Sequence, residues 1–309
     1  MHWFIFAISS PILLTLANQI DKHLIEEYFK GGGIGAMMIF SSLAGLLLFP
    51  LAFCFAGQKI LCVAPYDAMA LVGVGILSAL AVFCYLLALE EGETSVIVPF
   101  YQSVPIFGLI LAFLFLGEKI DILHLVSIPI IVTGSLILSF EIDADSGNRF
   151  KIRPIALILT SSLLFAINSI IFKKLALEYG FWESIFYEYV GLFCVGCILF
   201  SVTKNYRQQF IKVFKENRRK VLLFNISNEI LVLCGNLCVE YALILGPVAL
   251  VLLADSYQPI FVLIWGLVFA RFFPEMSYDN FSKKHLVKKV IGIAIIFIGS
   301  VAINIPSAR

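Results

Sequence analysis

The chain has 309 residues, of which 61% are hydrophobic and 14% are charged, and its mean hydropathy is +0.98. In soluble domains about a quarter of the residues are charged. This composition therefore excludes an ordinary soluble protein and predicts an all-α integral membrane protein. The net charge of +1 gives no reason to expect a nucleic acid partner.

Ten apolar stretches are each long enough to form a transmembrane helix. A helix needs ~20 mainly apolar residues to cross a hydrocarbon core that is ~30 Å thick. Charge clusters and glycine or proline residues separate these stretches, and they leave only short connections. The ten predicted helices are 2–20, 34–56, 67–89, 94–117, 121–141, 153–177, 182–203, 219–244, 247–273 and 286–305.

The chain also shows the pattern of an internal duplication. Four short matches recur in the same order, 146 to 165 residues apart: LLTLAN (13–18) with LLFAIN (163–168), FSSLAGL (40–46) with FYEYVGL (186–192), VPIF (104–107) with QPIF (258–261), and IIVTGSLIL (130–138) with IIFIGSVAI (295–303). We therefore predict two five-helix repeats, 1–145 and 153–309, joined by a linker at 146–152. Because five is odd, the second repeat enters the membrane from the opposite side, which gives inverted-topology repeats.

Basic residues set the expected orientation. Of the 22 lysines and arginines, 17 fall in the connections that follow odd-numbered helices. Lysine and arginine are enriched in cytoplasmic loops. This distribution therefore places the connections after odd-numbered helices in the cytoplasm and both termini on the opposite, outer side of the membrane. The most basic connection, KNYRQQFIKVFKENRRK, also contains apolar residues at the spacing of a short surface helix. We favour an ordinary basic cytoplasmic loop, and the alternative is a surface helix that binds anionic membrane lipid.

Polar residues within the eighth predicted helix lie on a single face. Asn225, Glu229, Asn236 and Glu240 recur at steps of four, seven and four residues. Glu229 is about ten residues from the basic loop, or ~15 Å along the helix axis, which places it near the middle of the bilayer. Ionisable side chains at that depth usually line a cavity. Glu240 falls near a helix end, where we expect a solvated carboxylate.

The fourth and ninth predicted helices carry related polar segments, each next to a proline. Asp255 and Gln258 precede Pro259, which has no N–H group, so we expect a bend and a free backbone carbonyl near Asp255. Tyr101 and Gln102 precede Pro105 at the matching position of the first repeat, where a second bend is expected. Both segments are therefore expected to face the substrate.

Three more residues complete the predicted substrate-binding set: Asn18, Asn168 and Glu188. Asn18 and Asn168 hold matching positions in the two repeats. For Asn18, Asn168, Gln102 and Glu188 the alternative, which stays open, is a structural role, because polar side chains also join membrane helices by hydrogen bonds. Glu118 ends the fourth helix and is expected to lie in water.

No motif predicts an enzyme. The four histidines form no HExxH or other ligand spacing, and no serine lies in a GxSxG turn. The sequence therefore predicts no catalytic residue, no metal and no cofactor.

Two long segments resemble the EamA-type branch of the drug/metabolite transporter superfamily. They are YLLALEEGETSVIVPFYQSVPIFGLILAFLFLGE (85–118) and its second copy, YALILGPVALVLLADSYQPIFVLIWGLVFARFFPE (241–275). The resemblance implies ten helices in two inverted repeats around a central cavity, which move small organic metabolites by alternating access, often as exporters. Members of that family usually keep both termini in the cytoplasm, whereas the basic residues here indicate the opposite. The ending RFFPE also departs from the LGE of the first copy.

The sequence thus predicts a multi-pass transporter of the inner or plasma membrane for amino acids or related compounds. Its expected partners are a small-molecule substrate, membrane lipid and, through Glu229 and Asp255, either a cationic group or a proton. A monomer suffices for this function. Two alternatives stay open, namely an uncoupled facilitator of the same fold and a non-transporting membrane scaffold or receptor.

Overall fold

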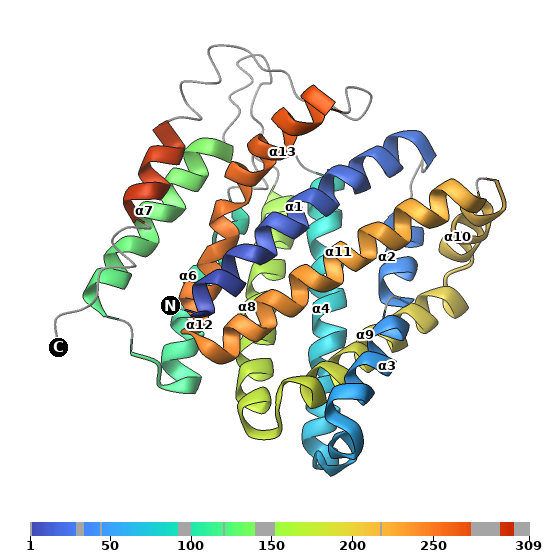
Figure 1. Cartoon of the computed structure of the whole chain (residues 1–309), viewed down its shortest axis with the longest axis horizontal. Helices are drawn as coiled ribbons and strands as arrows, with labels where there is room; N and C mark the ends of the chain where they lie inside the picture. Colours follow the sequence, from blue (N-terminus) through green and yellow to red (C-terminus); the bar gives the residue numbers. More distant parts are fainter. Residues whose placement is uncertain are drawn as a thin grey trace.

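The computed structural model describes residues 2–28, 34–43, 45–91, 100–119, 121–139, 152–216, 218–272 and 291–299. This part of the chain is helical apart from short turns, and it contains no strand (Figure 1). The all-α class predicted from the sequence is confirmed.

The first half contains six helices among the described residues. They are α1 (His2–Tyr28), α2 (Ile34–Leu43), α3 (Gly45–Ala56), α4 (Pro65–Glu91), α6 (Val104–Leu111) and α7 (Ile122–Ser139). A 3₁₀ turn at Gly57–Cys62 follows α3, and α6 continues in wider π-type turns at Ala112–Leu116. The first helix extends eight residues, or about two turns, beyond the predicted end at residue 20.

The second half begins with α8 (Ile152–Tyr179), α9 (Phe181–Val202) and a short α10 (Lys204–Glu216). It continues with α11 (Arg218–Leu245), α12 (Val248–Leu253), a 3₁₀ turn at Ala254–Tyr257 and α13 (Gln258–Phe272). Residues 291–299 form a last described helical segment. Residues 94–99 of the predicted fourth helix, linker residues 146–151 and the ends of the predicted tenth helix lie outside the described residues.

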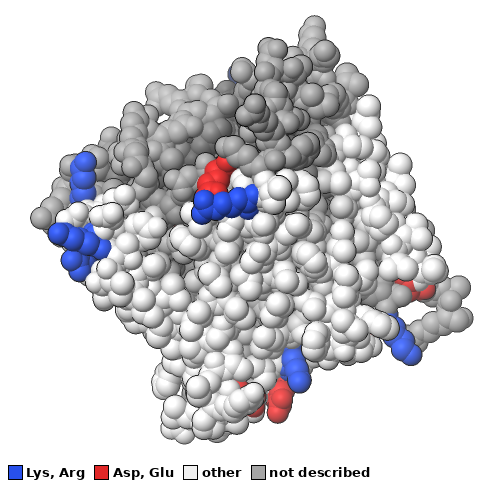
Figure 2. Space-filling model, turned by 180° about the vertical axis from the view of Figure 1, so that it is seen from behind, with Lys and Arg blue, Asp and Glu red and all other residues white. Residues whose placement is uncertain are grey.

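Several helices have the length and surface of membrane spans. Seven described helices are long and apolar enough to cross a bilayer, and two shorter apolar helices lie at Val104–Leu116 and Leu125–Ile137. Large apolar side chains such as Phe55, Leu61 and Phe115 are more than 60% exposed, as lipid-facing residues are. On the face in Figure 2 a broad band lacks charged side chains, and the coloured residues lie toward its margins. The chain is a multi-pass membrane protein, and the count of ten spans stays a prediction.

Helices from the two halves pack along one another. The helix α1 lies along α11, and α4 lies along α8 and α9 (Figure 1). The approach of α4 and α9 is close because Gly75 and Gly191 face each other: a Cβ atom added to Gly191 would meet the Gly75 Cα atom at 3.1 Å. Small residues allow this kind of contact between membrane helices.

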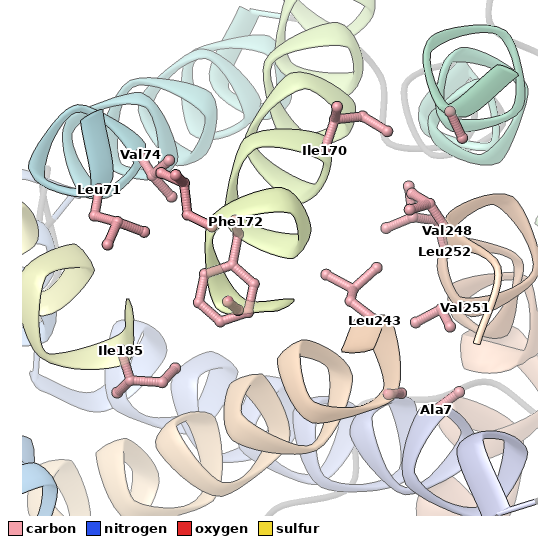
Figure 3. Close-up of a cluster of buried hydrophobic side chains, with 14 of the residues drawn as sticks. Ala7, Leu71, Val74, Ile170, Phe172, Ile185, Leu243, Val248, Val251 and Leu252 are labelled. Carbon is pink, nitrogen blue, oxygen red and sulfur yellow. The ribbon is translucent and has the colours of Figure 1, made fainter. Parts of the chain in front are cut away.

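An apolar cluster fills the space between the halves near one end of these helices. Figure 3 shows Phe172 of α8 among Leu71 and Val74 of α4, Ile185 of α9 and Leu243 of α11. Phe172, Leu71, Val74 and Ile185 are at most 1% exposed. This cluster fixes the relative positions of the four helices that also carry the polar residues described next.

Candidate functional site: a polar interior between the two halves

The ninth membrane segment is interrupted at its middle. The helix α12 ends at Leu253, and α13 starts at Gln258, one residue before Pro259. Proline has no N–H group, so the chain leaves the α-helical bonding pattern just before it. The carbonyl of Asp255, which we expected to be free, instead accepts the N–H of Gln258. The Gln258 side-chain amide also donates to the Asp255 carboxylate, with an Nε2–Oδ1 distance of 3.3 Å.

A second interruption faces the first. Gln102 and Ser103 form a turn, and α6 starts at Val104, with Pro105 in its first turn. The helix is therefore interrupted before Pro105 rather than bent at it. The two interruptions are joined by a hydrogen bond, because Ser256 Oγ donates to Gln102 Oε1 at 2.7 Å and both side chains are buried.

Sequence reasoning did not identify Ser256. It stands three residues before Pro259, as Gln102 stands three residues before Pro105. This shared spacing was the signal that could have identified it.

Aromatic rings surround the interruption that precedes Pro105. The Tyr101 ring makes edge-to-face contacts with Tyr85 of α4, at a centroid distance of 5.3 Å, and with Phe165 of α8, at 6.1 Å. The Tyr101 hydroxyl lies within electrostatic range of Asp255. The segment just before α6, the 3₁₀ turn at Ala254–Tyr257 and the start of α13 thus bring together four predicted residues: Tyr101, Gln102, Asp255 and Gln258.

The predicted polar face of α11 is largely buried. Asn225 and Glu229 are 6% and 5% exposed, and Asn236 is half-buried. Glu229 Oε1 accepts a hydrogen bond from Ser41 Oγ of α2 at 2.5 Å. A buried carboxylate needs such donors, because each unpaired oxygen has lost its hydration. This face of α11 therefore turns toward other helices rather than toward lipid.

Glu188 of α9 lies where four helices meet, and it is 3% exposed. Ser78 Oγ of α4 donates to Glu188 Oε1 at 3.4 Å, and Asn168 Nδ2 of α8 donates to that serine oxygen at 2.5 Å. From α11, the carboxyl group of Glu240 lies in hydrogen-bonding contact with that of Glu188. Glu240 is half-buried, and the expectation that it is solvated is wrong for its Oε2 atom, which the rotation of α11 turns into the interior and makes inaccessible to solvent.

Asn18 is placed differently from the other predicted residues. Its side chain on α1 is exposed, whereas its repeat counterpart Asn168 is half-buried and hydrogen-bonded to Ser78. The structure thus gives the two asparagines different surroundings.

Glu118 was expected to lie in water, but its side chain is directed into the protein. Gly117, with φ of 63°, ends the preceding helix in a left-handed turn, and the Glu118 N–H bonds to the Ala112 carbonyl. This turn directs the Glu118 side chain inward, where Lys173 Nζ donates to Oε1 at 2.5 Å and the Val248 N–H donates to Oε2 at 2.9 Å.

Lys173 was not identified from the sequence. Its side chain on α8 is 10% exposed, and Nζ also donates to the Gly246 carbonyl at 2.7 Å. Glu118 therefore caps the N-terminus of α12 and neutralises a buried lysine. No residue pattern signalled this contact, because its members come from three distant segments of the chain.

The described residues do not form a cluster of metal ligands. Within the described ranges, no three His, Cys, Asp or Glu side chains are grouped as metal ligands. The polar interior instead consists of carboxyl, amide and hydroxyl groups on helices from both halves, an arrangement suited to binding a small polar molecule.

Comparison with known proteins matches part of this chain to a family and the whole chain to a known fold. Residues 3–140 match the family model described as the EamA-like transporter family, which confirms the resemblance for that part of the chain. Among curated proteins, no sequence matches. Twenty-eight chains of solved structures match. For one of them, described as "Crystal structure of protein", the TM-score is 0.72 at 11% identity, and the match covers 98% of this chain and 96% of that one. That likeness shows a shared fold.

Proposed function

We propose that this chain, whose residues 3–140 match the EamA-like transporter family, is a transporter of small organic metabolites that works by alternating access. The substrate would bind in the polar interior between two inverted five-helix repeats, 1–145 and 153–309. The two halves would rock around that site and open it to one side of the membrane at a time.

One hydrogen bond carries the proposal of two related halves. Gln102 and Ser256 are 154 residues apart, as are Pro105 and Pro259, so the two bonded residues hold the same place in the two repeats. Residues that hold the same place in two copies of a unit can touch only where the axis that relates the copies passes between them. This contact supports a pseudo-twofold axis through the two helix interruptions.

The wider packing agrees with this axis. The first helix of the first half, α1, packs along α11, which is the third span of the second half. The equivalent pair, with the two halves interchanged, is α8, the first helix of the second half, and α4, the third span of the first half. These two helices also pack along each other. Gly134 of α7 likewise lies against Ile296, from the matching last segments of the two halves.

The chemistry of the interior favours a substrate with a positively charged amino group. The carboxyl groups are contributed by Glu188, Glu229, Glu240 and Asp255, whereas Lys173 is held by Glu118. An amino group would offer donors to these carboxylates, and nearby amides could bind a carboxylate or hydroxyl group of the same compound. The proposed substrate-binding set is Asn18, Tyr101, Gln102, Asn168, Glu188, Asn225, Glu229, Asn236, Asp255 and Gln258.

We further propose that α10 lies along the membrane surface. Phe210 packs against Phe40 and Phe200, while Lys204 and Lys212 are exposed. An amphipathic helix with this division of residues binds anionic lipid headgroups through its basic face. This placement would put α10 on the cytoplasmic side of an inner or plasma membrane.

Flux from liposomes tests the proposal. The full chain is reconstituted into liposomes loaded with a mixture of amino acids and simple amines, and mass spectrometry measures the loss of each compound. We expect the protein to release a subset faster than protein-free liposomes do. We expect Glu229→Gln to slow that release, while Glu178→Gln, at an exposed position, leaves it unchanged. Release no faster than in protein-free liposomes would favour a scaffold or receptor.

The facilitator alternative predicts a different result in the same liposomes. A coupled transporter accumulates its substrate against a gradient when a pH difference is imposed, whereas a facilitator only equalises concentrations. Accumulation that follows the imposed pH difference would contradict the facilitator.

A further inference from the structure

We propose that Glu188 and Glu240 form a buried binding site for one positive charge, supplied either by a proton that the two share or by the ammonium group of a transported compound. The second source rests on the proposed function, whereas the proton site does not. The site differs from Glu229 and Asp255, the residues that the sequence pattern favoured for this role.

The first observation is the contact between two acids. The carboxyl group of Glu188 on α9 and that of Glu240 on α11 are in hydrogen-bonding contact. Oε2 of each group is inaccessible to solvent, and neither Oε2 has a hydrogen-bond donor among the described residues. Each acid thus has an oxygen directed into a region where the described residues supply no proton donor.

Two ionised carboxylates cannot make this contact. An ionised carboxylate only accepts hydrogen bonds, so neither member could donate to the other. Two like charges at that distance in a medium of low dielectric also repel strongly, which is why neighbouring acid pairs in proteins share one proton. A single proton turns one acid into a donor for the other, and an ammonium group would supply donors to both oxygens.

The second observation is a buried polar group beside the pair. Tyr189, on α9 next to Glu188, is 3% exposed and lies in the electrostatic field of both acids. Its hydroxyl lies near the Asn236 side chain without a hydrogen bond of standard geometry, and it has no other partner in the described part of the chain. A ligand at the acid pair would have this hydroxyl available as a further contact.

The surrounding elements supply no compensating cation. From α4 and α8 the facing groups are the neutral side chains of Ser78 and Asn168. From α11 a third acid, Glu229, also acts on Tyr189. Lys173 of α8 bonds to Glu118, and the ion pairs among the described residues include neither Glu188 nor Glu240. The positive charge must therefore come from outside the side chains that the structure describes.

Other buried acids have donors of their own. Glu229 Oε1 accepts a hydrogen bond from Ser41, and Asp255 Oδ1 accepts one from Gln258. Such donors stabilise an ionised carboxylate. Glu188 Oε1 likewise accepts a hydrogen bond from Ser78. Among the described residues, however, Glu188 and Glu240 are two acids whose carboxyl groups meet and whose buried Oε2 atoms have no donor, so we place the positive charge at that pair.

Infrared spectroscopy of the purified full chain tests the proton directly. A protonated carboxyl group has a C=O stretching band that is separate from the carboxylate bands and shifts in D₂O. In sodium-free detergent solution at neutral pH, we expect such a band in the unsubstituted protein. We expect lower intensity in Glu188→Gln and in Glu240→Gln, because the remaining acid then accepts a bond from the glutamine amide and ionises.

The control is Glu178→Gln, an exposed acid of α8, which should keep the full band. An unsubstituted protein without the band, or equal intensity in all four proteins, would overturn the proposal. The two substitutions lie on different helices, so either of them suffices if the other fails to yield folded protein.

Methylammonium chloride distinguishes the two sources of positive charge. In weakly buffered solution, a proton released when methylammonium is added shows that an ammonium group displaces the shared proton. A preserved carboxyl band with no release assigns the site to the proton alone. Equal release from the double variant Glu188→Gln/Glu240→Gln would contradict displacement at this pair. Because these measurements need no transport, a failed flux experiment would overturn the proposed function and leave the proton site standing.

Discussion

The interior contains two buried acid clusters that are neutralised in opposite ways. Glu118 has both oxygens paired, one with Lys173 and one with the backbone N–H of Val248. Glu188 and Glu240 face each other, and each keeps an Oε2 atom without a donor among the described residues. The first cluster joins α6, α8 and α12, and the second joins α4, α8, α9 and α11.

This difference separates a structural role from a binding role. A buried charge that the protein itself neutralises stabilises one arrangement of helices, and it leaves nothing for a ligand to supply. A buried acid pair without a cation gains stability only from a bound proton or ligand. The comparison therefore predicts that substitutions in the first cluster affect stability, whereas substitutions in the second affect proton binding and transport.

Removal of Lys173 is expected to have the largest effect on stability. In Lys173→Met the Glu118 carboxylate stays in the protein interior without its cation, which costs about 3 kcal/mol. Thermal unfolding in detergent measures the loss, and Lys174→Met, at the exposed neighbouring position, serves as the control. Addition of Glu118→Gln to Lys173→Met should restore part of the stability. Equal unfolding temperatures for the two lysine variants would show that the ion pair is not structural.

Substitution at the close contact between α4 and α9 should cause the second-largest loss of stability. In Gly75→Ala the added Cβ atom would overlap the Glu188 carbonyl, so the helices must move apart at a cost of about 2 kcal/mol. Gly73→Ala on the same helix meets nothing within 4 Å and should be neutral or stabilising. The same loss in both variants would mean that glycine flexibility, rather than close packing, matters at this crossing.

The hydrogen bond between the two helix interruptions should contribute less. In Ser256→Ala the buried Gln102 Oε1 atom loses its donor, which costs about 1–2 kcal/mol. Ser135→Ala is a matched control, since that buried serine hydroxyl has no hydrogen-bond partner among the described residues. If the two alanine variants unfold at the same temperature, the contact at the proposed axis does not hold the halves together.

The sequence predicted the helices better than it predicted their contacts. The apolar stretches gave the positions of α4, α7, α8, α9 and α11 to within two residues, because span length is fixed by bilayer thickness. The periodicity of Asn225 and Glu229 predicted a single buried face, and these residues are buried. Local patterns of this kind depend only on neighbouring residues.

The errors concern acids near helix ends. Glu118 and Glu240 were expected in water because their distance from a helix end was the only information available. Whether such a residue meets water or protein depends on distant segments: Lys173 reaches Glu118 from 55 positions away, and Glu188 reaches Glu240 from the neighbouring helix α9. A single sequence does not contain these pairings.

Proton-linked flux tests the central claim of an acid pair that exchanges a positive charge during transport. Liposomes containing the full chain, an internal pH dye and the mixture of amino acids and amines are given an outward or inward pH gradient. For the unsubstituted protein we predict compound movement that follows the gradient, with protons moving in the opposite direction. Glu188→Gln and Glu240→Gln should abolish the gradient dependence, while Glu178→Gln keeps it. Compound flux that is unaffected by the gradient in all four proteins would contradict the account.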